Sequence, residues 1–315
     1  MKQKYIFKDK NFVECLKNGG AEDIYWNLVS LEFKKTKDWW ELVSPQDVID
    51  SIVIIDCSEQ IKDISGIGNF RNLEVLDLAD NKLKSLPKEI WNLSKLEVLS
   101  LWKNELTNLP KEIGRLKNLE ELEIYENEIT DLPREIWDLT SLIYLNLDNN
   151  RLITLPMEIG KLKNLEKLSL SNNKLRSLPE TIWNLTDLIR LYLDYNNLSS
   201  IPSTIWNLKR IKILSLSNNK IKKLPKEIGK LTNLYQLYLD NNKLVSLPKE
   251  IINLKNLLSL DLDWNSKLYD LNHNFYCTYT NLHCDKVIDA DNDWENDKYL
   301  CIQGDWEEYI NLWTE

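Results

Sequence analysis

Histidine and cysteine are the side chains best suited to metal binding and nucleophilic catalysis, and this chain of 315 residues holds two histidines and five cysteines. Both histidines, His273 and His283, lie near the carboxyl end. The residues there that would supply the nitrogen and sulfur ligands of a zinc ion are Cys277, His283, Cys284 and Cys301. Their spacing lacks the C-x-x-C pair typical of structural zinc sites, so the sequence does not predict a metal centre.

Three acidic residues in the same region, Asp289, Asp291 and Asp293, have the spacing that opens a calcium-binding loop. The match fails at its most specific positions, where Trp294 replaces the glycine and Leu300 replaces the terminal glutamate. The chain also lacks the G-x-S-x-G, phosphate-loop, H-E-x-x-H and dinucleotide-binding motifs. The sequence therefore predicts a protein that is not an enzyme and that uses no cofactor or metal.

Net charge and hydropathy argue against a nucleic-acid-binding protein and against a membrane protein. The formal net charge is −9, and an acidic chain repels nucleic-acid phosphates and anionic membrane surfaces. The first residues lack the apolar core of a signal peptide, and no run approaches the roughly 18 apolar residues of a membrane helix. We therefore expect a cytoplasmic protein without a membrane span. The odd number and wide scatter of the cysteines argue against a disulfide framework, although a secreted protein would allow one pair near the carboxyl end.

A regular repeat fills the middle of the chain. Written in rows of 23 from Leu73, residues 73–256 read L-x-x-L-x-L-x-x-N-x-L-x-x-L-P-x-x-I-x-x-L-x-x eight times without insertion. A ninth row begins at Leu257 and fades after Asn265. This length and spacing match the leucine-rich repeat signature, in which one repeat buries its apolar face only against its neighbours.

The recurring positions have structural explanations. The L-x-L core alternates inward and outward residues, which predicts a short strand that stacks on the next in a parallel sheet. An asparagine recurs every 23 residues from Asn81 to Asn265, and we expect its amide to satisfy backbone groups at the bend after each strand. The proline column from Pro87 to Pro248 is expected to turn the chain toward the convex side. We expect four tryptophans to pack between rungs there rather than bind a ligand: Trp91, Trp137, Trp183 and Trp206.

The segment LPKEIGRLKNLEELEI (109–124) and its echoes LPMEIGKLKNLEKLSL and LPKEIGKLTNLYQLYL resemble a known class of repeat. They are similar to the 23-residue repeats of Ras-suppressor-type proteins, plant intracellular Ras-group-related proteins and many bacterial leucine-rich repeat proteins. The resemblance implies an α/β solenoid with a curved parallel β-sheet on the concave face and turns and short helical segments on the convex face. It also implies non-enzymatic protein interaction through the concave sheet. The residue usage is in keeping with a bacterial member.

The repeats divide the chain into five expected segments. These are a helical N-terminal cap (1–48), a degenerate first repeat (49–72), the complete repeats (73–256), a partial ninth repeat (257–271) and a C-terminal cap (272–315). In the N-terminal cap we expect helices over 11–17 and 21–33, broken at Gly19 and Gly20, and a helix start near Ser44. In the C-terminal cap, one helix face is predicted from Trp306, Tyr309, Ile310 and Trp313. This helix is expected to cover the last rung, with a docking helix for a partner as the alternative.

The residues that flank the inward leucines point out of the concave face, and aromatic and acidic side chains gather among them. Aromatic side chains are enriched at binding hot spots because they bury much area at little entropic cost. The candidate binding residues are Trp102, Glu123, Tyr125, Tyr144, Asp148, Arg190, Tyr192, Asp194, Tyr195, Tyr238, Asp240, Asp263 and Trp264.

Carboxylates beside aromatic rings predict a protein partner with a basic surface, or with Arg and Lys side chains that lie on the rings. The leading hypothesis is therefore a non-enzymatic scaffold that binds a protein on its concave face. Recognition of a glycan or small ligand is an alternative, because sugars also bind to Tyr, Trp and Asp. A surface, adhesive or effector-type protein is another, as is a solvated sheet face without a ligand.

Overall fold

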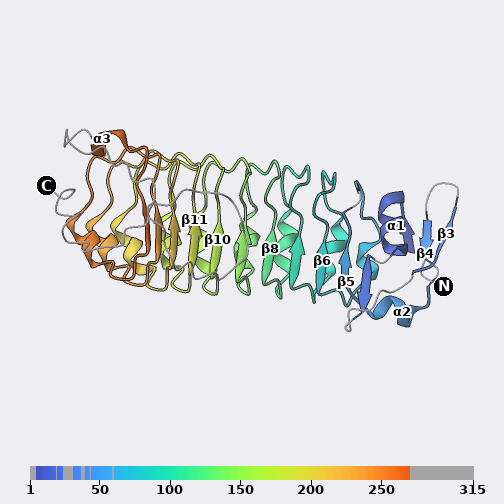
Figure 1. Ribbon diagram of the computed structural model, residues 1–315. Coiled ribbons are helices and arrows are strands. Elements are labelled where there is room, and N and C mark those ends of the chain that lie inside the picture. Colours follow the sequence, from blue (N-terminus) through green and yellow to red (C-terminus); the bar gives the residue numbers. More distant parts are fainter. Residues whose placement is uncertain are drawn as a thin grey trace. The chain divides into compact units, whose positions relative to one another are not determined.

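Rungs of one short strand and one short helix make up most of the chain in the computed structural model (Figure 1). The structure describes residues 5–18, 20–23, 31–36, 40–42, 44–58 and 60–269. The chain divides into two compact units, Met1–Leu168 and Ser169–Glu315. The boundary between them falls within strand β10 (Lys167–Ser169), and both units are built from the same rung.

The first unit contains a parallel sheet whose strands recur at the repeat interval. They are β5 (Ile52–Asp56), β6 (Val75–Asp77), β7 (Val98–Ser100), β8 (Glu121–Glu123) and β9 (Tyr144–Asn146). Val98 pairs with Val75 on one side and with Glu121 on the other, so equivalent residues of successive rungs lie side by side. The central residue of each strand from β6 to β9, such as Leu99, is fully buried, as is Ile55 of β5. The predicted leucine-rich repeat solenoid is confirmed.

The return segment of each rung in this unit is a 3-10 helix. These helices are η1 (Ile67–Asn69), η2 (Lys88–Asn92), η3 (Lys111–Arg115), η4 (Arg134–Asp138) and η5 (Met157–Lys161). From η2 on, each begins directly after the proline column, where the extended backbone of a residue such as Pro110 precedes the turn. The isoleucine of each of these helices, such as Ile113, is fully buried, which anchors the return segment to the core.

The second unit repeats this arrangement. Its parallel strands are β11 (Arg190–Tyr192), β12 (Ile213–Ser215), β13 (Gln236–Tyr238) and β14 (Ser259–Asp261). Its helices are η6 (Glu180–Asn184), η7 (Ser203–Asn207), η8 (Lys226–Lys230), η9 (Lys249–Asn253) and α3 (Ser266–Tyr269). The pairing of Leu214 with Leu191 and with Leu237 keeps the leucine columns in register.

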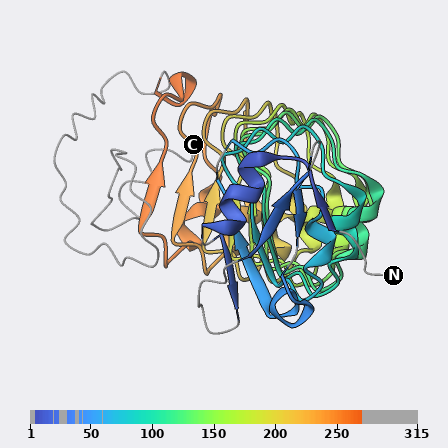
Figure 2. The same ribbon diagram turned by 90° about the vertical axis from the view of Figure 1, so that its right-hand side faces the viewer.

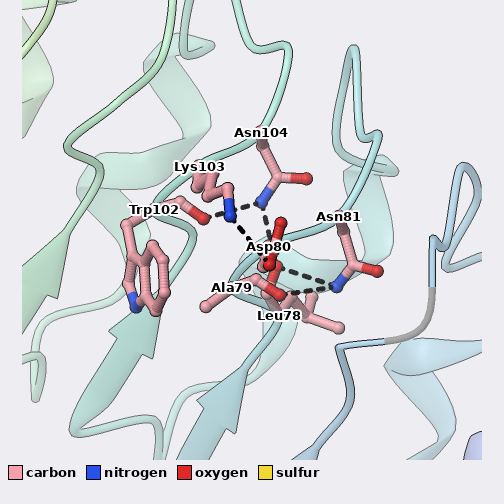
Figure 3. Close-up of polar contacts among 7 residues, drawn as sticks. All are labelled: Leu78, Ala79, Asp80, Asn81, Trp102, Lys103 and Asn104. Atoms are coloured by element: carbon pink, nitrogen blue, oxygen red, sulfur yellow. Dashed lines mark hydrogen bonds and ion pairs between the residues drawn. The ribbon is translucent and has the colours of Figure 1, made fainter.

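The asparagine column forms a ladder of buried amides, as predicted. Asn104 Nδ2 donates to Leu78 O of the preceding rung at 2.9 Å and to Leu101 O at 3.1 Å. Asn104 Oδ1 accepts from Leu83 N at 2.9 Å, so one side chain bridges two rungs. Figure 3 shows Asn104 beside Asn81, the ladder residue of the preceding rung. Because the ladder residues are engaged with the backbone, their recurrence explains the fold and not a ligand.

The tryptophans of the return segments follow the prediction in three positions. Trp91, Trp137 and Trp183 are at most 2% exposed and pack within the stack of rungs. Trp206 differs, because its ring is half-buried and has Lys230 Nζ at 5.0 Å and Lys209 Nζ at 5.5 Å from its centroid.

The described part of the N-terminal cap contains strands as well as helices. Residues 21–23 and Phe33 lie in strands, which corrects the two ends of the helix predicted over 21–33, and residues 24–30 lie outside the described residues. Its elements are β1 (Tyr5–Phe7), α1 (Lys10–Lys17), β2 (Ala21–Asp23), β3 (Phe33–Lys35), β4 (Trp40–Leu42) and α2 (Gln46–Asp50). Strand β2 pairs antiparallel with β5 of the first rung, so a backbone partner overrides the local helical pattern. Strands β1, β4 and β3 form a second, antiparallel sheet. Figure 2 shows these elements and α1 in front of the first rungs.

Ser44 has a different role from the predicted helix cap. Helix α2 begins at Gln46 with Pro45 in the capping position and without a side-chain cap. Ser44 Oγ instead accepts a hydrogen bond from Glu32 N at 2.8 Å. Helix α1 does have a side-chain cap, because Asp9 Oδ1 accepts from Asn11 N and Phe12 N.

A disulfide joins Cys15 of α1 to Cys57 at the end of β5, which corrects the expectation from cysteine scatter. The pair is separated by 42 residues in sequence, with 5.8 Å between the Cα atoms, and both side chains are buried. Sequence distance hides this proximity because α1 folds back against the first rung. The proposed zinc ligands, the calcium-like loop and the predicted C-terminal helix lie outside the described residues.

Candidate functional site

Strand alternation determines which side chains reach the face of the sheet opposite the core. In β8 and the residues after it, Leu122 and Ile124 are fully buried, whereas Glu121, Glu123 and Tyr125 alternate with them. We call this outward surface the strand face, made of the positions equivalent to Glu121, Glu123 and Tyr125 on every rung, with the residue that follows them. The candidate binding residues all occupy the strand face, as two groups in the two units.

The first group, the N-terminal cluster, consists of Trp102, Glu123, Tyr125, Tyr144 and Asp148. Trp102 and Tyr125 hold equivalent positions on adjacent rungs. Their ring centroids are 5.1 Å apart and the ring planes differ by 5°, so the two rings are stacked. Both residues are half-buried, which leaves part of each ring at the surface.

Tyr144 is the polar centre of this cluster. Its hydroxyl accepts from Asn146 Nδ2 at 2.9 Å and is hydrogen-bonded to the Glu123 carboxylate. Lys167 Nζ lies 4.3 Å from the centroid of the Tyr144 ring, which is a cation–π contact. Burial and the charge of Glu123 raise the pKa of Tyr144, so the phenol stays protonated. Asn146 and Lys167 belong to the site although the predicted set does not include them.

Two carboxylates of the first unit have raised pKa values. Burial is the largest cause for Glu123, and the charges of Glu121 and Asp77 add to it, while Tyr144 and Lys167 act in the opposite direction. Burial also raises the pKa of Asp56, followed by the charge of Asp77. These groups therefore form a concentration of negative charge on β5, β6 and β8 that extends beyond the predicted set.

Asp148 completes the N-terminal cluster from the rung after Tyr125. It is half-buried, and its backbone N–H donates to Asn146 Oδ1 at 3.1 Å. Its charge contributes to the raised pKa of Tyr144. The structure therefore brings all five predicted residues of this cluster onto consecutive rungs.

The second group, the C-terminal cluster, lies in the second unit and consists of Arg190, Tyr192, Asp194, Tyr195, Tyr238, Asp240, Asp263 and Trp264. Arg190 and Tyr192 are the outward residues of β11, and Tyr238 is an outward residue of β13, together with Gln236. Arg190 and the two tyrosines are half-buried on the strand face. The strand register therefore places a ring on alternate rungs of this unit.

Asp194 is held by a hydrogen-bonding network rather than presented to solvent. Asp194 Oδ1 accepts from Ser217 N at 2.8 Å and from Ser215 Oγ, and Oδ2 accepts from Ser171 Oγ at 3.3 Å. Burial raises the pKa of Asp194, against the opposing effect of these hydrogen bonds. Asp240 accepts from Ser217 Oγ in the same way. These carboxylates bridge rungs, and a role in binding a partner stays a prediction for them.

Tyr195 and Trp264 occupy an unusual backbone position. Their φ values are 51° and 58°, in the left-handed region that bulky side chains rarely adopt. The same position on other rungs holds the polar residues Asp80, Lys103, Glu126, Asn149, Asn172, Asn218 and Asn241. Tyr195 is 56% exposed and Trp264 is 80% exposed. A strained residue that also exposes a large ring is a candidate for function.

Two classes of site are absent from the described part of the chain. No group of three or more His, Cys, Asp or Glu residues in that part is arranged to hold a metal ion. None of its helices is long and apolar enough to cross a membrane.

A sequence pattern described as a leucine-rich repeat region matches residues 49–154, 134–212 and 197–277. The chain belongs to the leucine-rich repeat family. The pattern spans the rungs of both units, including the first rung, whose strand β5 begins at Ile52. No curated protein sequence matches this leucine-rich repeat protein.

Several solved leucine-rich repeat structures are similar to this one. A leucine-rich repeat protein of Leptospira interrogans is 45% identical over 70% of this chain and 56% of its own, with a TM-score of 0.68. Internalin C2 of Listeria monocytogenes is 26% identical over 74% of this chain and 96% of its own, with a TM-score of 0.61. The Arabidopsis receptor kinase HAESA, solved with the peptide hormone IDA and a co-receptor, is 26% identical over 78% of this chain and 47% of its own, with a TM-score of 0.61. This chain thus spans little more than half of the Leptospira protein.

Proposed function

We propose that this leucine-rich repeat protein is a non-enzymatic scaffold that binds a protein or peptide partner on its strand face. The partner is proposed to carry a basic surface, or Arg and Lys side chains that contact the aromatic rings. Leucine-rich repeat proteins are in general protein-interaction scaffolds, and the HAESA structure contains a bound peptide hormone. The family relationship supports the general function, and the strand face is our proposal for its location.

The stacked pair Trp102 and Tyr125 is the observation that carries this proposal. The core of the rungs is complete without these rings, because Leu101 and Ile124 beside them are fully buried. A polar residue at the positions of Trp102 and Tyr125 would expose less apolar surface. The next rung has such a residue, Asp148, at the equivalent position. Large rings at the surface of a sheet are typical of binding hot spots.

Charge supports a basic partner. The N-terminal cluster contains Glu123 and lies beside Asp77 and Glu121, whose charges act on it. Like charges held this close repel one another, and a cationic partner would relieve that repulsion. The net charge of −9 also favours encounter with a basic protein.

The disulfide of the N-terminal cap supports a proposal about the compartment. The sequence favours the cytoplasm, whereas the Cys15–Cys57 disulfide favours an oxidising compartment, because cytosolic thiols are kept reduced. We therefore propose that the protein functions outside the reducing cytosol. Thiol labelling of the native protein after cell fractionation tests this: reactive Cys15 and Cys57 in a cytosolic fraction would support the cytoplasmic prediction instead.

Affinity capture with aromatic variants tests the proposed face. The variants are Trp102→Ala with Tyr125→Ala, and Tyr192→Ala with Tyr238→Ala. The matched control is Tyr235→Ala, because Tyr235 is 40% exposed but precedes β13 and lies outside the strand face. A partner identified with the wild-type protein is purified and its affinity for each variant is measured.

We expect each double variant to weaken the purified partner's binding by about tenfold or more, because hot-spot rings dominate interface energy. Tyr235→Ala should bind like the wild type. Equal affinity of all variants would overturn the proposed face, and selective binding to a glycan array would replace the protein partner with a sugar.

A further inference from the structure

Two carboxylates and a buried hydroxyl lie beside the aromatic stack of the first unit, and we call these three residues, Asp77, Ser100 and Glu123, the acidic site. Strand register places Asp77, Ser100 and Glu123 side by side on β6, β7 and β8. Adjacent strands are about 4.8 Å apart, so the serine lies midway between two carboxylate-bearing positions roughly 10 Å apart. All three residues are on the strand face, because their neighbours Leu76, Leu99 and Leu122 point into the core.

The hydroxyl of Ser100 in the acidic site is buried without a hydrogen-bond partner. Ser100 is 3% exposed, and within the described part of the chain its Oγ has no hydrogen-bond partner. Buried hydroxyls are normally paired, because a buried group without a partner loses its hydrogen bonds to water. A hydroxyl that lies between two carboxylates and bonds to neither marks a place where a donor from outside would be accommodated.

The stacked rings of Trp102 and Tyr125 lie beside the acidic site. Trp102 follows Ser100 by two residues on the same face, and one side of its ring is covered by Tyr125. The other side of the ring is directed toward the preceding rung, where the equivalent residue is the small Ala79. Asp80 N, next to Ala79, donates to Trp102 O at 2.9 Å, which fixes the two rungs against each other. Figure 3 shows the indole of Trp102 and, on the preceding rung, Ala79.

The two carboxylates of the acidic site favour a cation, and the charge of Lys167 offsets that of Glu123 only in part, because the pKa of Glu123 remains raised. Lys167 lies over the Tyr144 ring, and Lys103 Nζ pairs with Asp80 Oδ2 at 3.0 Å, as Figure 3 shows. The combination of two carboxylates, an unpaired hydroxyl and an aromatic face suits a guanidinium group. Guanidinium is planar, stacks on indole and donates several hydrogen bonds in one plane, whereas an ammonium is a strongly hydrated point charge.

We propose that the acidic site is an arginine-binding subsite, in which a guanidinium from a protein partner stacks on Trp102 and donates hydrogen bonds to Asp77 and Glu123. The guanidinium also offers Ser100 Oγ the donor that it lacks. The subsite rests on the proposed function, because it assigns a specific partner side chain to the strand face. The remaining strand-face residues then provide contacts that do not depend on arginine.

The test uses the capped peptide acetyl-Gly-Arg-Gly-amide and the full-length protein. The control peptide contains citrulline in place of arginine, and citrulline has nearly the same shape but carries no charge. Binding is followed by NMR through the indole N–H signal of Trp102, which is assigned by its loss in Trp102→Phe. The variants are Asp77→Asn with Glu123→Gln, and Ser100→Ala. The matched control is Glu120→Gln, an identical change at an exposed residue that precedes β8.

We expect saturable shifts with the arginine peptide and binding at least about tenfold weaker for the citrulline peptide. The double variant should weaken arginine-peptide binding to a similar degree, Ser100→Ala should weaken it less, and Glu120→Gln should not change it. Equal binding of the two peptides, or unchanged binding in the double variant with its thermal unfolding intact, would overturn the subsite.

Partner capture separates this result from the broader proposal. If the double variant keeps the full affinity for the purified partner while the aromatic variants lose it, the arginine subsite is wrong and the strand-face proposal stands. If the aromatic variants also keep full affinity, the strand-face proposal fails as well.

Discussion

Cys15 and Cys57 fasten the N-terminal cap to the first rung at the position that the inward Leu78 occupies on the second rung. Cys57 N donates to Asp77 O at 2.9 Å, as Leu78 N does to Ser100 O, and Cys57 O accepts from Asn81 Nδ2 at 2.7 Å, as Leu78 O does from Asn104 Nδ2. The backbone of Cys57 therefore keeps the pattern of the later rungs. Its side chain bonds to Cys15 of helix α1, whereas the side chain of Leu78 packs in the core.

Reduction of this disulfide is expected to destabilise the first unit. The bond closes a loop across a sequence separation of 42 residues, so its loss should cost about 3–4 kcal/mol of unfolding free energy, chiefly by freeing the unfolded chain. Urea unfolding of the oxidised protein, the reduced protein and Cys15→Ser with Cys57→Ser measures this. The reduced wild type and the double variant should both unfold earlier, and an unchanged midpoint in both would show that the disulfide does not stabilise the cap.

A methyl group at Gly229 is expected to push two rungs apart. A Cβ at this position would lie 2.1 Å from Glu250 O of the next rung, and backbone cannot yield as a flexible side chain does. Gly229→Ala should therefore cost about 1–3 kcal/mol of unfolding free energy through overpacking. The control is Lys226→Ala on the same 3-10 helix, where the side chain is exposed and a change within about 0.5 kcal/mol is expected. Equal stability of the two variants would show that the rungs separate without cost.

The 23-residue ladder made most of the fold predictable, because each of its residues has one role that recurs on every rung. Leu99 must point inward and Asn104 must bridge rungs wherever the row is repeated, so strands, bends and 3-10 helices follow from spacing. The cap has no such recurrence. The segment Ala21–Asp23 has a helical pattern, and only the nearby edge of β5 makes it a strand.

The sequence predicts which residues of the candidate site point outward, but not which of their side chains contact one another. Alternation identifies Trp102 and Tyr125 as outward residues, but the parallel stacking of their rings depends on side-chain packing. The reach of Lys167 over Tyr144 and the burial of Ser100 arise in the same way. Asp194 is a further example. Its position in the sequence predicts a carboxylate that can bind a partner, but in the structure it accepts hydrogen bonds from Ser215 and Ser217 of the next rung.

Removal of a ladder amide is expected to cost far more than removal of an exposed one. Asn104→Ala leaves Leu83 N buried without its hydrogen-bond partner, while Leu78 O keeps its bond from Asn81 Nδ2, so roughly 1–3 kcal/mol of unfolding free energy should be lost. The control Asn118→Ala also deletes a hydrogen bond, from Asn118 Nδ2 to Ser94 O at 2.9 Å, but at an exposed position. Thermal unfolding should separate the two variants clearly, and similar midpoints would contradict a structural role for the column.

The raised pKa of Glu123 predicts a pH-dependent gain in stability from Glu123→Gln. In the folded protein, burial first and then the charges of Glu121 and Asp77 disfavour the ionised carboxylate, so its folded pKa lies above its unfolded pKa. Ionisation therefore costs the folded state free energy once the pH exceeds the unfolded pKa, which is about 4.3. Below that pH the carboxyl is protonated in both states and the penalty disappears.

Glu123→Gln removes the charge and keeps a carbonyl oxygen that accepts a hydrogen bond from Tyr144. We expect the variant to be more stable than the wild type near pH 7, with the difference shrinking toward zero near pH 3, where the wild-type carboxyl is protonated in both states. Urea unfolding at several pH values measures the difference. Glu120→Gln, whose carboxylate precedes the strand and is exposed, should show no such pH-dependent gain. A Glu123→Gln variant that is less stable at neutral pH would mean that the carboxylate stabilises the strand face, and that the contacts of Tyr144 and Lys167 outweigh its burial.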